Sequence, residues 1–140
     1  MELLVLSSLE KVFSDEKPSA PEYKRFSMLR NERSSFQVAF CCDSDEKISV
    51  SAEGKLAKKS KIFFVKDVPV GNACFDDADD FYLRKKSGDY PDCLVPADKE
   101  IGVKKGKWYS CWIEVSPDGE SGESELSVKL ESDSECAEGS

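Results

Sequence analysis

The sequence predicts an all-β fold: a single antiparallel β-sandwich domain of the immunoglobulin-like or jelly-roll-like kind. Three observations support this prediction. Apolar residues alternate with polar ones along several short segments, as in half-buried strands. Turn-forming Gly, Pro and Asp residues separate those segments, and no window of about eleven residues carries the apolar stripe of a helix. A chain of 140 residues also suits one ordinary domain.

The clearest strand is predicted at 107–115, where Tyr109, Cys111, Ile113 and Val115 share one face. The segment 34–41 alternates in the same way. Further strands are expected at 3–6, 26–30, 47–52, 61–70 and 124–130. In a sandwich, the apolar faces of two sheets meet in the core and the polar faces point outward.

Two segments lack this alternation. Residues 71–100 combine aromatic, proline and charged residues with little periodicity, so we expect a long functional or interaction loop. Residues 132–140 hold three acids and no hydrophobe larger than Cys or Ala. They are expected to form an acidic tail or a linker, which places the sandwich domain at 1–131.

Charge and composition exclude several functions. The 20 basic and 28 acidic residues give a formal charge of −8, of which residues 117–140 carry −7. The remaining chain is nearly neutral, so neither nucleic acid nor an anionic membrane surface is an expected partner. The sequence has no histidine, which excludes Ser-His-Asp and Cys-His nucleophile systems and His-containing zinc sites.

The cysteines and the N-terminus indicate a reducing compartment. Six cysteines occur without a CxxC pair, and Cys41 and Cys42 are adjacent, where a mutual disulfide would be strained. We therefore expect free thiols. Only four apolar residues follow Glu2, too few for a signal peptide. A cytoplasmic location is expected, although a chain whose export signal had been removed would look the same.

Several ordered blocks resemble a known family. They are Ser7–Phe13, Leu29–Arg33, Ser35–Ala39, Val68–Val70, Tyr82–Arg84, Gly88–Asp92 and Trp108–Val115. In that order and spacing they resemble the N-terminal β-sandwich domain of bacterial proteins related to glycoside hydrolase family 123. Many of these relatives are known only as a domain of unknown function with a glycoside-hydrolase fold.

The resemblance implies a partner and no catalysis in this chain. In such proteins a (β/α)8 barrel follows the sandwich and carries an adjacent Asp-Glu pair that works with the acetamido group of the substrate. No part of that barrel lies in this sequence, so no catalytic residue is assigned and the chain alone is not expected to be an enzyme. The implied function is that of a non-catalytic accessory module packing on the barrel, with no cofactor.

Two groups of residues are candidates for a carbohydrate site or a domain interface. Trp108, Trp112 and Glu114 share the strand face opposite Cys111, and the two tryptophans, if exposed, would lie roughly 13 Å apart. That face would be covered by another domain or by the long loop, would belong to the core, or would bind glycan. The second group lies on the predicted long loop: Tyr82, Arg84, Tyr90 and Asp92.

The remaining acidic residues lead to no metal prediction. Asp76, Asp77, Asp79 and Asp80, with Asp89 and Asp92, could offer oxygen ligands to Ca²⁺, but the spacing is not that of an EF-hand loop. A solvated acidic loop explains them. Two alternative functions remain open: a carbohydrate-binding module that works on its own, and a protein-interaction sandwich without a sugar role.

Overall fold

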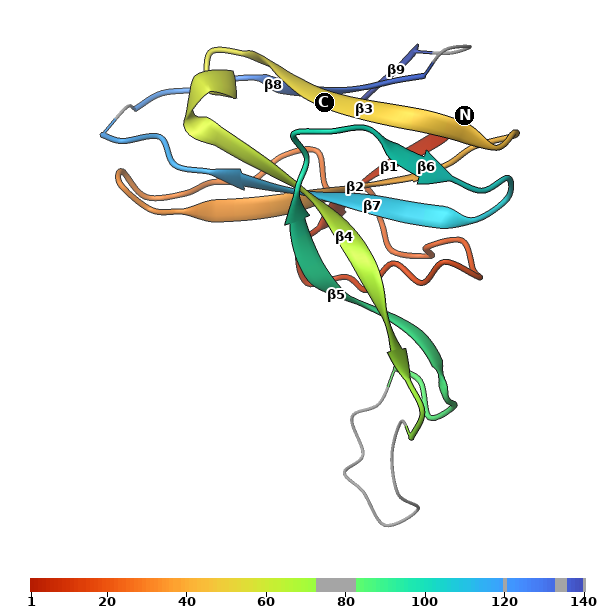
Figure 1. The fold of residues 1–140 in the computed structure, drawn as a ribbon. Helices are drawn as coiled ribbons and strands as arrows, with labels where there is room; N and C mark the ends of the chain where they lie inside the picture. Colours follow the sequence, from red (N-terminus) through yellow and green to blue (C-terminus); the bar gives the residue numbers. More distant parts are fainter. Residues whose placement is uncertain (73–82, 120, 133–135, 140) are drawn as a thin grey trace.

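A computed structural model describes residues 1–72, 83–119, 121–132 and 136–139 (Figure 1). The chain forms two antiparallel sheets, which confirms the all-β sandwich. The five-stranded sheet has the order β1-β2-β7-β4-β5. Its strands are β1 (Glu2–Ser7), β2 (Ser34–Cys41), β7 (Trp108–Val115), β4 (Ser60–Val70) and β5 (Gly88–Pro96).

The second sheet has four strands in the order β6-β3-β8-β9. They are β6 (Ile101–Val103), β3 (Glu46–Gly54), β8 (Leu126–Glu131) and β9 (Cys136–Gly139). A short 3-10 turn, η1 (Ala57–Lys59), precedes β4. Among the described residues no helix is long and apolar enough to cross a membrane.

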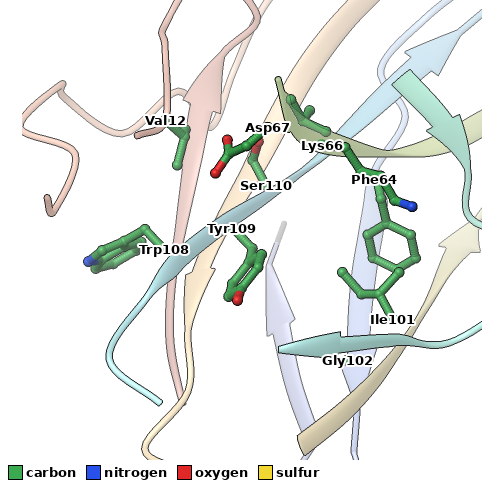
Figure 2. A pocket seen from close by; sticks show the side chains of 10 residues that line it. Val12, Phe64, Lys66, Asp67, Ile101, Gly102, Trp108, Tyr109 and Ser110 are labelled. Carbon is green, nitrogen blue, oxygen red and sulfur yellow. The ribbon is translucent and has the colours of Figure 1, made fainter. Parts of the chain in front are cut away.

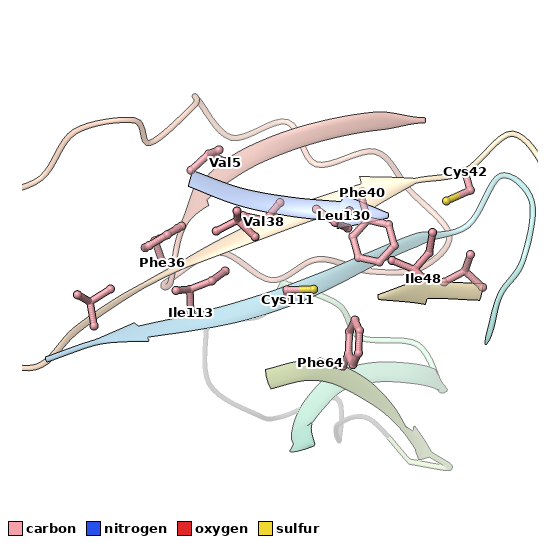
Figure 3. Close-up of a cluster of buried hydrophobic side chains, with 13 residues drawn as sticks. Val5, Phe36, Val38, Phe40, Cys42, Ile48, Phe64, Cys111, Ile113 and Leu130 are labelled. Atoms are coloured by element: carbon pink, nitrogen blue, oxygen red, sulfur yellow. The ribbon is translucent and has the colours of Figure 1, made fainter. Parts of the chain in front are cut away.

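The core lies between the two sheets (Figure 3). The predicted apolar face of β7 supplies Cys111, Ile113 and Val115, all buried. Phe40 and Phe64 enter from β2 and β4 of the same sheet, while β3 and β8 close the core from the other side. Burying a large apolar side chain contributes about 1.5–3 kcal/mol, so this face accounts for much of the driving force that joins the sheets.

The strand expected at 26–30 is absent, and this prediction was wrong. The segment belongs to the N-terminal segment (residues 8–33), which joins β1 to β2. Its Tyr23 N–H donates to the Val5 carbonyl at 2.8 Å, and the Tyr23 ring stacks on Phe26 with 5.6 Å between centroids. Phe26 and Met28 pack partly buried against the core. Their alternation therefore reflects packing at the sheet edge, without a hydrogen-bonded partner strand.

The prediction of a long loop at 71–100 was wrong in part, because residues 88–96 form strand β5. This strand pairs with β4 at the edge of the sheet and is mostly exposed, so it has no apolar alternation. The prolines of β5 are compatible with an edge strand, because proline has no N–H to donate to a further strand. Ala97 N–H donates to the Ile62 carbonyl at 3.0 Å, so the nitrogen of the preceding Pro96 faces the free edge. A missing N–H there costs no ladder hydrogen bond.

The expected tail also differs from the structure. Residues 136–139 form β9, which pairs with β8 in the second sheet. Gly139 lies against the side chains of β1, and a Cβ at this position would come within 2.6 Å of Leu3 Cδ2. The absence of a side chain at Gly139 thus allows the backbone to pack closely on Leu3 and Val5.

Candidate functional site

Trp108 lies on the outer face of β7, as the alternation predicted, but it does not point into solvent. Its side chain is only 6% exposed and packs with Leu6, Val12 and Ala39 in a second, smaller cluster. The N-terminal segment covers it, and Trp108 N–H donates to the Ser14 carbonyl at 3.0 Å. Of the possibilities left open for this face, the structure shows Trp108 covered, and the cover is the N-terminal segment.

One buried polar side chain, Gln37 on β2, holds this cover in place. Its Nε2 donates to the carbonyls of Ser7, Ser8 and Glu10 at 3.3, 3.3 and 2.8 Å. Its Oε1 accepts from Ser110 Oγ at 3.2 Å. The sequence analysis did not identify Gln37; the available signal was a polar residue between Phe36 and Val38 in a strongly apolar strand.

Trp112 and Glu114 lie further along the outer face of β7, where both side chains are half-buried. Phe63 of β4 is the direct cross-strand partner of Trp112, so the two side chains share a face. The pairing of β4 with β5 sets Pro96 opposite Phe63 and Leu94 opposite Val65, so these residues lie beside them. These five residues define the outer-face patch: Phe63, Val65, Leu94, Pro96 and Trp112.

The outer-face patch is apolar and partly open. Leu94 is 44% exposed, and Phe63, Val65 and Trp112 are half-buried. At its border, Arg33 Nε lies 3.6 Å from Glu114 Oε1. Phe63 and Leu94 were not predicted, because the pairing of β4 with β7 sets Phe63 opposite Trp112 and the pairing of β5 with β4 brings Leu94 beside Val65.

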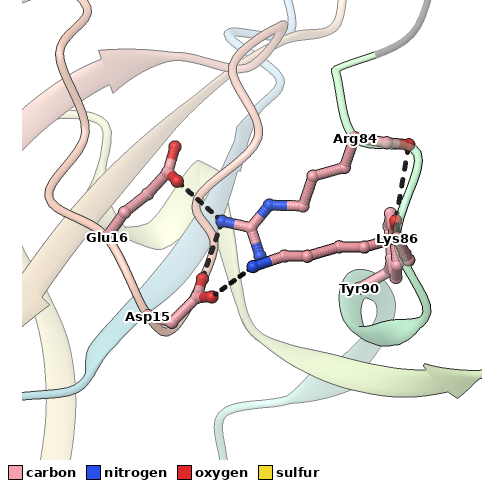
Figure 4. Close-up of polar contacts among 5 residues, drawn as sticks. All are labelled: Asp15, Glu16, Arg84, Lys86 and Tyr90. Carbon is pink, nitrogen blue, oxygen red and sulfur yellow. Dashed lines mark hydrogen bonds and ion pairs between the residues drawn. The ribbon is translucent and has the colours of Figure 1, made fainter.

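Arg84 and Tyr90 meet at a different place (Figure 4). Beyond Val65, β4 and β5 leave the sandwich together as an arm, here residues 66–72 and 83–92 (Figure 1). Arg84 Nη2 contacts Asp15 Oδ1 at 2.7 Å and Glu16 Oε2 at 2.8 Å. The guanidinium carbon lies 3.7 Å from the centroid of the Phe13 ring.

These contacts tie the arm to the N-terminal segment. Tyr90 packs edge-on against Phe13 with 5.7 Å between centroids, and its hydroxyl donates to the Lys86 carbonyl. The hydrogen bond from Arg84 lowers the pKa of Asp15, and Lys86 adds a weaker effect. Since Arg84 is largely buried and its partners are intramolecular, this cluster acts as an anchor in the structure.

The other sequence candidates do not join either group. Asp92 is exposed on β5, two residues beyond Tyr90. Tyr82 and the acidic residues 76–80 lie outside the described residues. Within the described part of the chain, no group of three or more Cys, Asp or Glu side chains could hold a metal ion. Four of the cysteines are described as free thiols: Cys41, Cys42, Cys93 and Cys111.

A cavity of about 230 Å³ opens where the arm leaves β7 (Figure 2). The pairing of β4 with β7 ends at Val65 and Ser110. Phe64, Trp108 and Tyr109 line this fork cavity together with the charged side chains of Lys66 and Asp67.

The fold and these surfaces define a β-sandwich domain, and its described residues include an outer face that is covered around Trp108, an apolar patch on the same face and a small cavity. No protein-family model matches the chain, and no curated protein sequence matches it. Among solved structures, it is similar to a family 123 glycoside hydrolase from Clostridium perfringens, studied for glycolipid glycan hydrolysis. The TM-score is 0.56 at 13% identity, covering 78% of this chain and 20% of the hydrolase.

This likeness supports a shared fold with part of a family 123 hydrolase, which confirms the resemblance at that level alone. The chain spans about a fifth of the length of that hydrolase.

Proposed function

We propose that the chain is a non-catalytic accessory β-sandwich of a glycoside-hydrolase-like protein, and that it packs on a catalytic (β/α)8 barrel of that protein through the outer-face patch. The observation that carries the proposal is the patch itself, supported by the fold likeness to a fifth of a family 123 hydrolase. Contiguous apolar side chains on an otherwise polar surface are typical of contact surfaces.

The composition of the patch favours a protein partner. Val65, Leu94 and Pro96 are aliphatic, and burying such surface is worth about 25 cal/mol per Å². An apolar centre bordered by charged groups, here Glu114 paired with Arg33, is the usual organisation of protein interfaces. The acidic surroundings needed for glycosidase chemistry, two carboxylates held in a cleft, have no counterpart in the patch.

The first experiment is an activity assay. The purified chain is incubated with N-acetylhexosaminide reporters, and we expect no hydrolysis above the buffer rate. Hydrolysis by the chain itself would refute the non-catalytic role. The reading frame that encodes the chain is examined at the same time, and a barrel with consecutive Asp and Glu at a strand end is the expected neighbour.

The second experiment tests the surface. Leu94→Asp should weaken binding of that barrel, supplied as a separate protein, by at least about tenfold, because a carboxylate would be buried without a partner. Leu29→Asp is the matched control, since Leu29 is also exposed but is not one of the five patch residues. If the two variants bound the barrel equally well, the patch would not be part of the interface.

A stand-alone carbohydrate-binding module is the second candidate, favoured by the cross-strand pair Phe63 and Trp112 beside Glu114. It predicts quenching of Trp112 fluorescence by a glycan that binds the isolated chain. If the chain bound no glycan on an array, this candidate would be excluded. Self-association through the patch would instead favour a protein-interaction sandwich without a sugar role.

A further inference from the structure

An Asp-Gly dipeptide, Asp118–Gly119, follows β7 where the chain leaves the five-stranded sheet. Both residues have positive φ, 50° at Asp118 and 84° at Gly119. Ser116 N–H donates to the Lys59 carbonyl, and the Pro117 carbonyl accepts from Lys59 Nζ, each at 3.0 Å. The chain just before the dipeptide is therefore held in place by hydrogen bonds.

Neither chemical group that matters in this dipeptide has a partner among the described residues. The Asp118 carboxyl is exposed and makes no hydrogen bond or ion pair with them. The Gly119 N–H likewise donates to no described acceptor. Gly119 also has no side chain to shield its nitrogen. The nitrogen and Asp118 Cγ are thus both free to react, and a bond between them would close a five-membered ring.

Asn31 provides a comparison within the same structure. It is exposed and has a φ of 68°, but the N–H that follows it, on Glu32, donates to the Leu29 carbonyl at 3.0 Å. That nitrogen is engaged, and the Glu32 side chain stands beside it. Asp118 is the only Asp or Asn in the sequence that precedes a glycine. Sequence and hydrogen bonding therefore distinguish one position from the others.

We propose that Asp118 is a site of spontaneous isomerisation to isoaspartate. The Gly119 nitrogen attacks Asp118 Cγ, a C–N bond forms, and the carboxyl hydroxyl leaves with the amide proton as water. Water then adds to one of the two carbonyls of the resulting succinimide. Addition at Cγ restores aspartate, whereas addition at the main-chain carbonyl breaks the original peptide bond and leaves the chain running through Cγ. The mass is unchanged, and no enzyme or cofactor is needed.

The conformation of Asp118 favours the isoaspartate product. A residue with a Cβ adopts a left-handed φ at a conformational cost, even though Asp tolerates it better than most. In isoaspartate the chain passes through the former side chain, so this restriction no longer applies at position 118. The dipeptide shares no residue with the outer-face patch, and the inference is therefore independent of packing on a barrel.

The test is ageing of the folded chain at 37 °C and mildly acidic pH, followed by tryptic mapping. Trypsin releases the peptide 108–129, in which Asp118 is the only Asp. We expect this peptide to split into two chromatographic peaks of equal mass, and electron-transfer fragmentation should identify isoaspartate in the new peak. The peptide 87–99 holds three Asp residues, none followed by glycine, and should remain a single peak. An unaged sample corrects for isomerisation during digestion.

Variants connect the second peak to the dipeptide. Asp118→Glu should abolish it, because the longer side chain would have to close a six-membered ring. Gly119→Ala should slow its appearance by about tenfold, because a Cβ then crowds the nitrogen. Asp98→Glu is the matched control, since Asp98 is exposed but precedes a lysine, and it should change nothing.

A synthetic peptide of residues 116–125 supplies the rate without a folded structure. Because the fold leaves both groups of the dipeptide free, the folded chain should isomerise within about tenfold of this peptide. Three outcomes would overturn the proposal: an unsplit peptide 108–129, a second peak that persists in Asp118→Glu, or a folded chain slower than the synthetic peptide by more than that factor. The last would show that the folded turn protects the dipeptide.

Discussion

Gln37 should be the side chain on which the covered face of the sandwich depends most. It is 3% exposed and bonds the Ser7 carbonyl at the end of β1, two carbonyls of the N-terminal segment and the Ser110 hydroxyl. Gln37→Met keeps the length of the side chain and removes all four hydrogen bonds. The buried Ser110 hydroxyl then loses its partner, which costs about 1–3 kcal/mol. Glu10 is exposed, so water can replace part of what its carbonyl loses.

The expected total is about 2–4 kcal/mol of unfolding free energy, since a net hydrogen bond contributes roughly 0.5–1.5 kcal/mol and methionine recovers some apolar burial. Urea unfolding measures this loss, and acrylamide quenching of Trp108 in a Trp112→Phe background reports whether the cover opens. Ser110→Ala completes a double-mutant cycle. Unchanged stability together with unchanged quenching would refute the role assigned to Gln37.

Three further predictions concern the anchor, the thiols and the last strand. Arg84→Met should lower stability by about 1–2 kcal/mol and speed amide exchange at 88–91, whereas Lys99→Met should do neither. Arg84 lowers the pKa of Asp15 in the folded state, so this ion pair stabilises the fold above about pH 4, and the stabilisation is lost as the pH falls through that lowered pKa. If the stability of Arg84→Met fell with decreasing pH in the same way as that of the unaltered chain, this prediction would be contradicted. Burial raises the pKa of the Cys111 thiol, so peptide mapping after alkylation of the native protein at pH 8 should find exposed Cys93 modified and Cys111 intact. Gly139→Val should displace β9 from Leu3 and lower the melting temperature, unlike Gly71→Val, where a Cβ meets nothing within 4 Å.

The strands that sequence reasoning identified correctly are those with one buried and one polar or covered face. β7 is the clearest case, because Cys111, Ile113 and Val115 alternate with residues on the other side. β5 escaped prediction because an exposed edge strand has no face that must be apolar, and its two prolines read as loop signals. The segment 26–30 was misassigned for the opposite reason, since its apolar residues alternate while packing at an edge.

The candidate site residues show the same division. The alternation correctly placed Trp108 and Trp112 on the outer face of β7, but it could not distinguish the covered one from the half-open one. That difference depends on Gln37 and on the N-terminal segment, which reaches Trp108 from more than ninety residues earlier in the chain. The partners of Arg84, at Asp15 and Glu16, are similarly distant in sequence.

The sequence alone determined the fold class, most of the strands and the core-facing side of β7. These follow from the pleat, which assigns successive side chains to opposite faces and is therefore legible in local alternation. The tertiary structure decided which outward side chains are covered, which form the outer-face patch and where the fork cavity opens. Each of these depends on how segments distant in sequence meet, and local alternation carries no information about such long-range packing.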